Sequence, residues 1–448
     1  MKNHTSLITI LILAVLCLNN AGAQNPLIRD QFTADPTARV FNGRVYVYPS
    51  HDIRAPESFA RKDWFCMEDY HVFSSSNLTD WTDHGVIVSQ DKVPWVNATS
   101  YSMWAPDCIE RNGKYYFYFP ANISSASGRG FGVGVAIADD PAGPYTPQPA
   151  PIANVRGIDP ALFIDKDGQA YIYWSLNKIF AAKLKDNMLE LASEPVVLED
   201  LPKQGLVEGP FMFERNGIYY MTYPHVQNKT ERLEYAISDN PMGPFKFTGV
   251  IMDESPSGCW TNHQSIVEFN NQWYLFYHDK DLSPKFDKNR SVRVDSLFFN
   301  SDGTIRKVTP TLRGVGVTSA SGQIEPDRYS HISPEGTTVV FLDTLNTFKG
   351  WKTVLDKKNA WIRYNAVDFG SKKLKHIQIN AASLTGGKIL LRLDEPDGAV
   401  LAEIKIPEGK DWSAVNARVS GFQKGIHDLI IVLDDDNAVE IDWIKFLK

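Results

Sequence analysis

The feature that most constrains how this chain can fold is a segment that recurs five times between residues 27 and 315. Each copy reads as a polar or acidic residue, a short apolar run, a two-residue turn and an aromatic-rich strand. Asn-Gly and Asp-Gly pairs are strong hairpin signals, because both central positions of such a turn adopt positive φ. The five turns fall at Asn42-Gly43, Asn112-Gly113, Asp167-Gly168, Asn216-Gly217 and Asn270-Asn271.

These hairpins recur about every 50 to 70 residues, which is typical of one four-stranded blade of a β-propeller. The sequence therefore predicts an all-β chain whose residues 27–315 form a five-bladed propeller. A β-sandwich is the alternative for this region, but a sandwich gives no reason for the same hairpin to recur.

The composition agrees with an all-β globular protein. Of the 448 residues, 43% are hydrophobic and 12% aromatic, with 30 Gly and 26 Pro, which favours strands and tight turns and excludes wholesale disorder. The net charge is −7 and no basic run occurs, so a nucleic-acid partner is not expected.

The N-terminus has the pattern of an export signal. Lys2 precedes an apolar run at residues 6–18, and small residues at 21–23 offer a cleavage site. The run is too short to span a bilayer stably, so no membrane span is expected. We predict a signal peptide at residues 1–23 and a periplasmic or secreted protein, with a membrane anchor or a lipoprotein modified at Cys17 as alternatives. The cysteines beyond it allow at most one disulfide.

Each repeat also places a residue with a carboxyl, imidazole or indole side chain at an equivalent position, seven or eight residues before its turn. Because the innermost strands of a propeller line its central channel, equivalent positions should converge at one mouth. Paired carboxyl groups suit glycoside hydrolysis, a third carboxyl nearby would raise the pKa of the acid, and an aromatic ring suits the apolar face of a sugar. The converging residues are Asp35, Trp104, Asp159, Glu208 and His263.

The ordered motifs ADPT, WAPD, DPALF, EGPF and NHQS resemble glycoside hydrolase family 43 over residues 27–315. That family contains inverting exo- and endo-acting enzymes on arabinose- and xylose-containing glycans, built on a five-bladed propeller. The resemblance implies that Asp35 is the general base, Glu208 is the general acid, and Asp159 tunes the pKa of the acid and orients it.

The same resemblance suggests further site residues. It implies that His263 contacts a central calcium ion or its water shell, and that Arg290 lies near the substrate and the tuning carboxylate. Trp104 is either a sugar platform or part of a blade core. His51 and Asp52, which close the first repeat, are candidates for lining the pocket.

Residues 311–337 are rich in Gly, Ser, Thr and Pro, as a linker or domain edge would be. The strands expected after it predict a jelly-roll-like β-sandwich at residues 318–448, which resembles a family 6 carbohydrate-binding module. The binding residues usual in such modules are missing, so a structural role is as good an interpretation as sugar binding.

Together these features predict an exported, exo-acting and inverting glycosidase that removes terminal α-L-arabinofuranosyl residues from plant-type polysaccharides or glycoproteins. A β-D-xylosidase with the same mechanism is the alternative. A catalytically silent propeller that only binds glycan is a third hypothesis of a different class.

Overall fold

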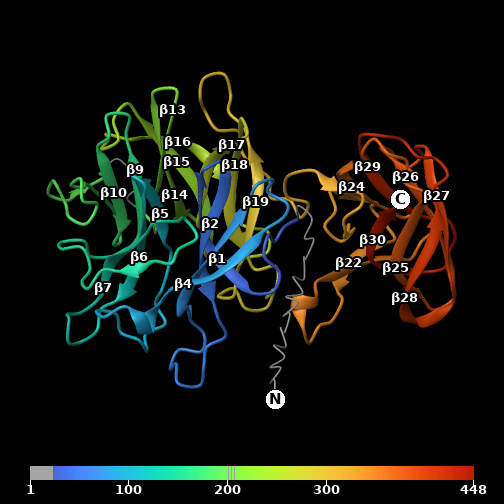
Figure 1. Ribbon diagram of the computed structural model, residues 1–448, viewed down its shortest axis with the longest axis horizontal. Coiled ribbons are helices and arrows are strands. Elements are labelled where there is room, and N and C mark those ends of the chain that lie inside the picture. The colour runs from blue at the N-terminus through green and yellow to red at the C-terminus, as the bar shows by residue number, and fades with distance from the viewer. Residues whose placement is uncertain (1–23, 200, 203, 206) are drawn as a thin grey trace, which may run out of the picture.

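The computed structural model describes residues 24–448 except 200, 203 and 206, so the predicted signal peptide lies outside the described residues. Nearly all regular structure in the described part is β, arranged as two bodies joined by a short connection (Figure 1). No helix among the described residues is long and apolar enough to cross a membrane. The predicted all-β fold class is confirmed.

The larger body consists of five antiparallel sheets that follow one another along the chain. In the first, β1 (Phe32–Phe41), β2 (Arg44–Asp52), β3 (Asp69–Ser75) and β4 (Thr82–Ser89) pair in sequence order; a short 3₁₀ helix, η1 (Gln90–Lys92), follows. The other sheets are β5 (Asp107–Arg111), β6 (Lys114–Asn122), β7 (Phe131–Ala138) and β8 (Thr146–Pro147); β9 (Ile158–Ile164), β10 (Ala170–Ser175), β11 (Ile179–Lys183) and β12 (Val196–Val197); β13 (Phe211–Arg215), β14 (Ile218–Val226), β15 (Glu231–Ser238) and β16 (Lys246–Met252); and β17 (Ser265–Phe269), β18 (Gln272–Asp279) and β19 (Ser291–Leu297).

The first strands of the five sheets form a closed ring. β1 contacts β5, β5 contacts β9, β9 contacts β13, β13 contacts β17, and β17 returns to β1. Each sheet is therefore a blade whose first strand faces the centre, as predicted from the repeat.

The fifth sheet has three paired strands, and the N-terminal segment runs along its outer strand β19. The backbone N–H of Leu27 donates to the carbonyl of Val292 (2.8 Å). The buried side chain of Asn25 donates to the carbonyl of Val294 (3.0 Å) and accepts from its N–H (2.9 Å). Residues 25–27, which lead into β1, are thus tied to the last blade and help to close the ring.

Four of the five predicted turns have both central residues at positive φ and join strands that are two residues apart. The Asp167-Gly168 pair differs, because only Gly168 has positive φ and the loop spans residues 165–169. The prediction of a two-residue turn was wrong at this position. The N–H of Gly168 donates to the carbonyl of Asp165, which makes a longer turn between β9 and β10.

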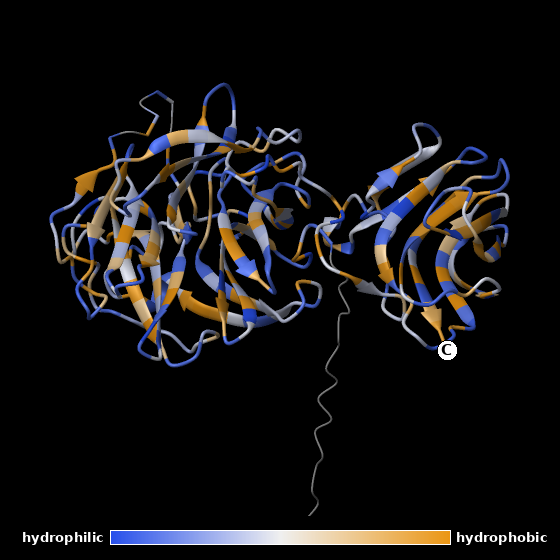
Figure 2. Cartoon of the chain, turned by 90° about the horizontal axis from the view of Figure 1, so that it is seen from above, coloured by the Kyte–Doolittle hydropathy of each residue, from blue (hydrophilic) through white to orange (hydrophobic). Residues whose placement is uncertain are grey.

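The smaller body is a two-sheet sandwich with an apolar core between the sheets, including Ile362, Ile377, Leu391 and Ile431. Hydrophobic and hydrophilic residues alternate along its strands, as expected when one face of each sheet is buried (Figure 2). One sheet contains β20 (Thr318–Ser319), β21 (His331–Ile332), β24 (Trp361–Asp368), β26 (Gly387–Leu393), β27 (Val400–Ile406) and β29 (Ile426–Leu433), and the other contains β22 (Thr337–Phe341), β23 (Trp351–Leu355), β25 (His376–Ser383), β28 (Gly409–Arg418) and β30 (Val439–Leu447); a second 3₁₀ helix, η2 (Thr347–Lys349), precedes β23.

The two bodies share a buried, polar contact at the propeller's N-terminal segment. The guanidinium of Arg328 lies 3.7 Å from the ring centroid of Trp351 and donates to the carbonyl of Asn25 (3.1 Å). Gln24 donates to the hydroxyl of Tyr364 in the sandwich (2.9 Å). The sandwich therefore packs directly on the segment that closes the propeller ring.

Candidate active site

A single small pocket collects side chains from all five blades. Its volume is about 120 Å³, below the roughly 300–1,000 Å³ typical of pockets for drug-sized ligands. The first strand of each blade, or the loop before it, supplies most of the lining, because these segments meet at one end of the ring. The lining residues are Asp35, Trp64, Phe65, Met67, Trp104, Ala105, Ile158, Asp159, Glu208, Trp260, Thr261, Asn262, His263 and Arg290.

Asp35 and Asp159 enter the pocket from irregular points in their strands. Asp35 has a φ of 45° and lies where the register between β1 and β2 shifts. Asp159 has a φ of 56° and lies near a shift between β9 and β10. Left-handed backbone is unfavourable for a residue other than glycine, and such strain together with a β-bulge is common where a side chain is aimed at a functional site.

The charge of Asp35 is stabilised by an arginine from the fifth blade. Arg290 donates to both carboxylate oxygens of Asp35, at 2.6 and 3.1 Å, and Ser50 donates to one of them at 2.8 Å. Burial alone would raise the pKa of Asp35, but Arg290, followed by His278, His263 and Ser50, brings it down to about 2. Asp35 is therefore a carboxylate at any ordinary pH, as a general base must be.

Arg290 is held from its other side by Asp52. The backbone N–H and the Nε of Arg290 both donate to Asp52, at 2.7 and 3.0 Å. Asp52 is completely buried and does not line the pocket, so it positions the arginine rather than touching a ligand. The sequence-based expectation placed Arg290 near Asp159, and both residues line this pocket; the structure adds that the ion pair of Arg290 is with Asp35.

Asp159 and Glu208 show the opposite shift to Asp35, because their pKa values are raised rather than lowered. Burial, then the neighbouring Glu208 and Asp35, raise the pKa of Asp159 well above its ordinary value. Burial also raises the pKa of Glu208; the charge of Asp35 adds to this, while Glu231 and Arg290 partly offset it. The N–H of Gly209 donates to Asp159 at 3.1 Å, which fixes Asp159 beside Glu208. A carboxyl that retains its proton is what a general acid requires.

The repeat did not reveal Glu231, a fourth carboxyl group at this site. It begins β15, accepts from the backbone N–H of Asn262 at 2.5 Å, and shares a hydrogen bond with Glu208. Burial and the charge of Glu208 raise the pKa of Glu231 well above normal, so its proton is available to donate to Glu208. Glu231 starts the third strand of its blade, whereas the equivalent positions in the repeat lie in or just before the first strand, so no sequence signal pointed to it.

His263 lines the pocket and is neutral. Burial lowers its pKa to about 4, although the charge of Asp35 raises it. Among the described residues, His263 belongs to no group of three His, Cys, Asp or Glu side chains close enough to hold one ion. Calcium prefers six to eight oxygen ligands, so the protein side chains alone fit calcium poorly here. The calcium ion implied by the resemblance stays a prediction.

Aromatic rings form much of the remaining wall. Trp104 lines the pocket and also packs on Phe131, with ring centroids 4.7 Å apart, so it belongs to both the pocket and a blade core. Trp64, Phe65 and Trp260 were not found from the sequence, because they lie in loops outside the repeat. Such flat apolar surfaces suit the faces of sugar rings.

His51, a candidate for lining the pocket, is not among the residues that do so. Its Nδ1 lies 2.6 Å from Asp69 Oδ1, so the ring turns toward β3 instead. The three cysteines of the described chain, Cys66, Cys108 and Cys259, are buried and free, so the one disulfide that the sequence allowed does not form among them.

Comparison with known proteins agrees with this geometry. The family model for glycosyl hydrolases family 43 matches residues 23–305, and that for the carbohydrate binding module (family 6) matches residues 334–448. The xylosidase/arabinosidase 43A of Humicola insolens is 38% identical over 330 residues, covering 62% of this chain and 98% of the relative. The arabinoxylan arabinofuranohydrolase of Bacillus subtilis (strain 168) is 28% identical over 496 residues, covering 95% of this chain and 93% of the relative.

Among solved structures, a family 43 beta-xylosidase/alpha-arabinofuranosidase from a compost microbial metagenome, in complex with xylotriose, is 36% identical with a TM-score of 0.57. The match covers 64% of this chain and 98% of that one. With the matched family spanning the propeller and its three acidic residues meeting in one pocket, the chain belongs to glycosyl hydrolase family 43 and is a glycoside hydrolase with a C-terminal region of the family 6 module type.

Proposed function

We propose that the protein is an exo-acting, inverting glycosidase that releases terminal α-L-arabinofuranosyl residues from plant-type polysaccharides or glycoproteins. The observation that carries this proposal is the opposite pKa shift of two carboxyl groups in one pocket. The pKa of Asp35 is lowered to about 2 and that of Glu208 is raised, so one is ready to accept a proton and the other to donate one.

In this mechanism Glu208 protonates the glycosidic oxygen while Asp35 takes a proton from the attacking water on the opposite face of the sugar. Arg290 keeps Asp35 ionised and oriented, and Asp159 lines the pocket with the acid, its own pKa raised by burial and by Glu208. Attack by water in one step leaves the product with inverted anomeric configuration, because no sugar–enzyme bond forms.

Exo action is supported by the size and lining of the pocket. A volume of about 120 Å³ walled by Trp64, Trp104 and Trp260 suits one terminal sugar better than a continuous chain. The relative from Bacillus subtilis, which matches almost the whole chain including the second body, is named an arabinoxylan arabinofuranohydrolase. That name supports arabinofuranosyl as the first choice.

A β-D-xylosidase with the same mechanism is the second candidate. The relative from Humicola insolens is named for both activities, and one from Xylanibacter ruminicola, 34% identical over 318 residues, is named a beta-xylosidase. Both are more identical over the 62% of this chain that they match than the arabinofuranohydrolase is over the 95% that it matches.

The deciding experiment compares aryl α-L-arabinofuranoside with aryl β-D-xyloside at equal concentrations. We expect a higher kcat/KM for the arabinofuranoside and, by ¹H NMR, the anomer opposite to that of the substrate as the first product. A higher kcat/KM for the xyloside would select the second candidate, and retained configuration would contradict inversion. Saturable sugar binding with no release of reducing sugar would support the glycan-binding hypothesis instead.

We also propose that the protein is exported after cleavage at residues 21–23 and that calcium contributes at His263. N-terminal sequencing of protein from the periplasm or medium tests the proposed export.

For the proposed calcium, removing calcium with a selective chelator should lower activity, and calcium should restore it in wild type but not in His263→Ala. Unchanged activity after chelation would leave His263 a neutral pocket residue.

A further inference from the structure

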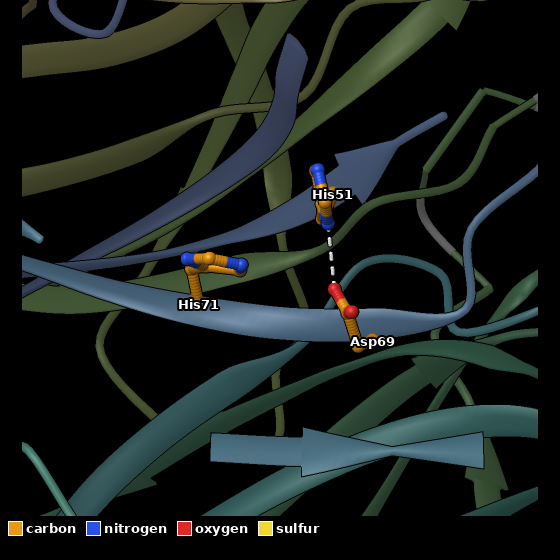
Figure 3. Close-up of side chains that lie close together, drawn as sticks. All are labelled: His51, Asp69 and His71. Carbon is orange, nitrogen blue, oxygen red and sulfur yellow. Dashed lines mark hydrogen bonds and ion pairs between the residues drawn. The ribbon is translucent and has the colours of Figure 1, made fainter. Parts of the chain in front are cut away.

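A second cluster of metal-binding side chains lies in the first blade, outside the catalytic pocket. One potential ligand atom from each of His51, Asp69 and His71 lies within 4.8 Å of the others, and no other such group occurs among the described residues. His51 lies near the end of β2, and the other two residues lie near the start of β3, with all three side chains directed into the same space (Figure 3).

Two imidazoles and one carboxylate form a donor set with a clear chemical preference. Zinc and similar divalent transition metals bind His nitrogen and Asp oxygen, whereas calcium and magnesium prefer oxygen alone. His51 Nδ1 and Asp69 Oδ1 are 2.6 Å apart, and the ring centroids of His51 and His71 are 4.9 Å apart. The three side chains are 13–18% exposed, so they are sheltered but reachable from solvent.

Asp83 supplies the outer support that a metal-binding histidine needs. His71 Nδ1 lies 3.0 Å from both carboxylate oxygens of Asp83, which leaves Nε2 available to a metal. Asp83 is itself held by the N–H of Gly85 (2.7 Å) and the amide of Gln31 (3.1 Å). A carboxylate behind the histidine fixes its tautomer and orientation and makes it a better ligand.

The surroundings of the cluster are acidic. Asp83, Asp69 and Asp30 act electrostatically on His71, and Glu68 lies close to Asp69 and His51. Negative charge around two imidazoles favours a bound cation over the empty cluster.

The cluster also lies at the base of a loop that builds the catalytic pocket. Residues 53–68 connect β2 to β3, and Trp64, Phe65 and Met67 of this loop line the pocket. Phe65 packs over the guanidinium of Arg290, with the ring centroid 4.8 Å from Cζ. An ion joining both ends of the loop would hold this wall against the arginine.

We propose that His51, Asp69 and His71 bind one zinc-class divalent ion, oriented by Asp83, and that this ion clamps the pocket loop at residues 53–68. The ion is structural and takes no part in bond cleavage. The site is separate from the proposed catalytic residues, so its test does not depend on which sugar is released.

The test uses full-length protein stripped of metal by a chelator and titrated with zinc chloride by calorimetry near neutral pH. We expect one zinc per chain, with His51→Ala and His71→Ala weakening binding by more than about 100-fold and Asp83→Asn by about 10- to 100-fold. His84→Ala is the matched control, because His84 lies on the neighbouring strand and contacts Ser74 rather than the cluster. Its affinity for zinc should equal that of the wild type.

A second measurement follows the loop itself. Arg61 and Lys62 are exposed, so trypsin can cut the loop there, and zinc should slow that cleavage in wild type but not in His71→Ala. Circular dichroism without metal verifies that the variants fold. The proposal is overturned if wild type binds no zinc saturably, if the histidine variants bind it equally well, or if zinc leaves loop cleavage unchanged.

Discussion

Asp35 and Glu208 share one pocket yet differ in their proton affinity, and their roles can be separated by substitution. Asp35→Asn and Glu208→Gln should each lower kcat roughly 10²- to 10⁴-fold, the usual contribution of a general base or acid. Glu268→Gln is the matched control, since Glu268 is exposed on β17 and should retain full activity. Comparable thermal melting curves show that the fold survives, and full activity in either pocket variant would refute the assignment.

We expect Arg290 to set the position of the acid limb in the pH profile of kcat/KM, through the pKa of Asp35. Because the arginine is the main influence lowering the pKa of Asp35, Arg290→Met should raise that pKa and leave less carboxylate at a given acidic pH. The acid limb of kcat/KM, which reports the free enzyme, should therefore move to higher pH. Arg290→Lys keeps the charge but not the bidentate contact, so its acid limb should lie between those of the wild type and Arg290→Met. An unmoved limb would mean that another group governs it.

Glu231 adjusts the proton affinity of Glu208 without lining the pocket. Glu231→Ala removes the hydrogen bond that lowers the pKa of Glu208, so the alkaline limb of kcat/KM should move to higher pH. Glu231→Gln keeps an N–H donor and should leave the limb near its wild-type position. If both variants only lower expression or stability and the limb stays in place, Glu231 has a purely structural role.

At the scale of elements, the N-terminal segment completes the fifth blade. Asn25 is fully buried and makes three hydrogen bonds to backbone groups of residues 294 and 311. Asn25→Ala leaves these groups unpaired, so the free energy of unfolding should fall by at least about 3 kcal/mol. Asn187→Ala, at an exposed turn, should change it by less than about 1 kcal/mol. Urea titrations of both variants measure the difference, and equal midpoints would contradict the closure role.

The elements also show how far local patterns predict structure. Four hairpins follow directly from Asn at positive φ before Gly or Asn, because the turn chemistry is contained in two adjacent residues. At Asp167-Gly168 the same kind of pair forms a longer turn, since Asp167 does not adopt positive φ and residues 165–169 close the loop. The register of β9 and β10 beside the turn is regular and the N–H of Asp165 donates to the carbonyl of Gln169, so three residues form the turn, which the pair itself does not encode.

At the scale of the whole molecule, the sandwich and the propeller are coupled through Trp351. Its ring lies beneath Arg328, which also bonds the propeller's Asn25. Trp351→Ala should uncouple the two bodies, so that calorimetry shows two unfolding transitions where the wild type shows one. Trp412→Ala, on β28, removes a ring that lies 5.8 Å from Lys352 Nζ within the sandwich; it is the control and should keep a single transition. Two transitions in the wild type would show that the bodies already unfold independently.

The sequence by itself determined the number of blades, most of the hairpins and the three acids of the pocket, because a repeated local pattern places equivalent residues at equivalent points of a ring. The tertiary structure alone decided which groups these acids meet. The pairing of Arg290 with Asp35 and Asp52, the approach of Glu231 to Glu208, and the grouping of His51 with His71 join strands that are distant in sequence or paired in a particular register. Side-chain direction and burial set those contacts and therefore the charges, and neither is contained in a local pattern of residues.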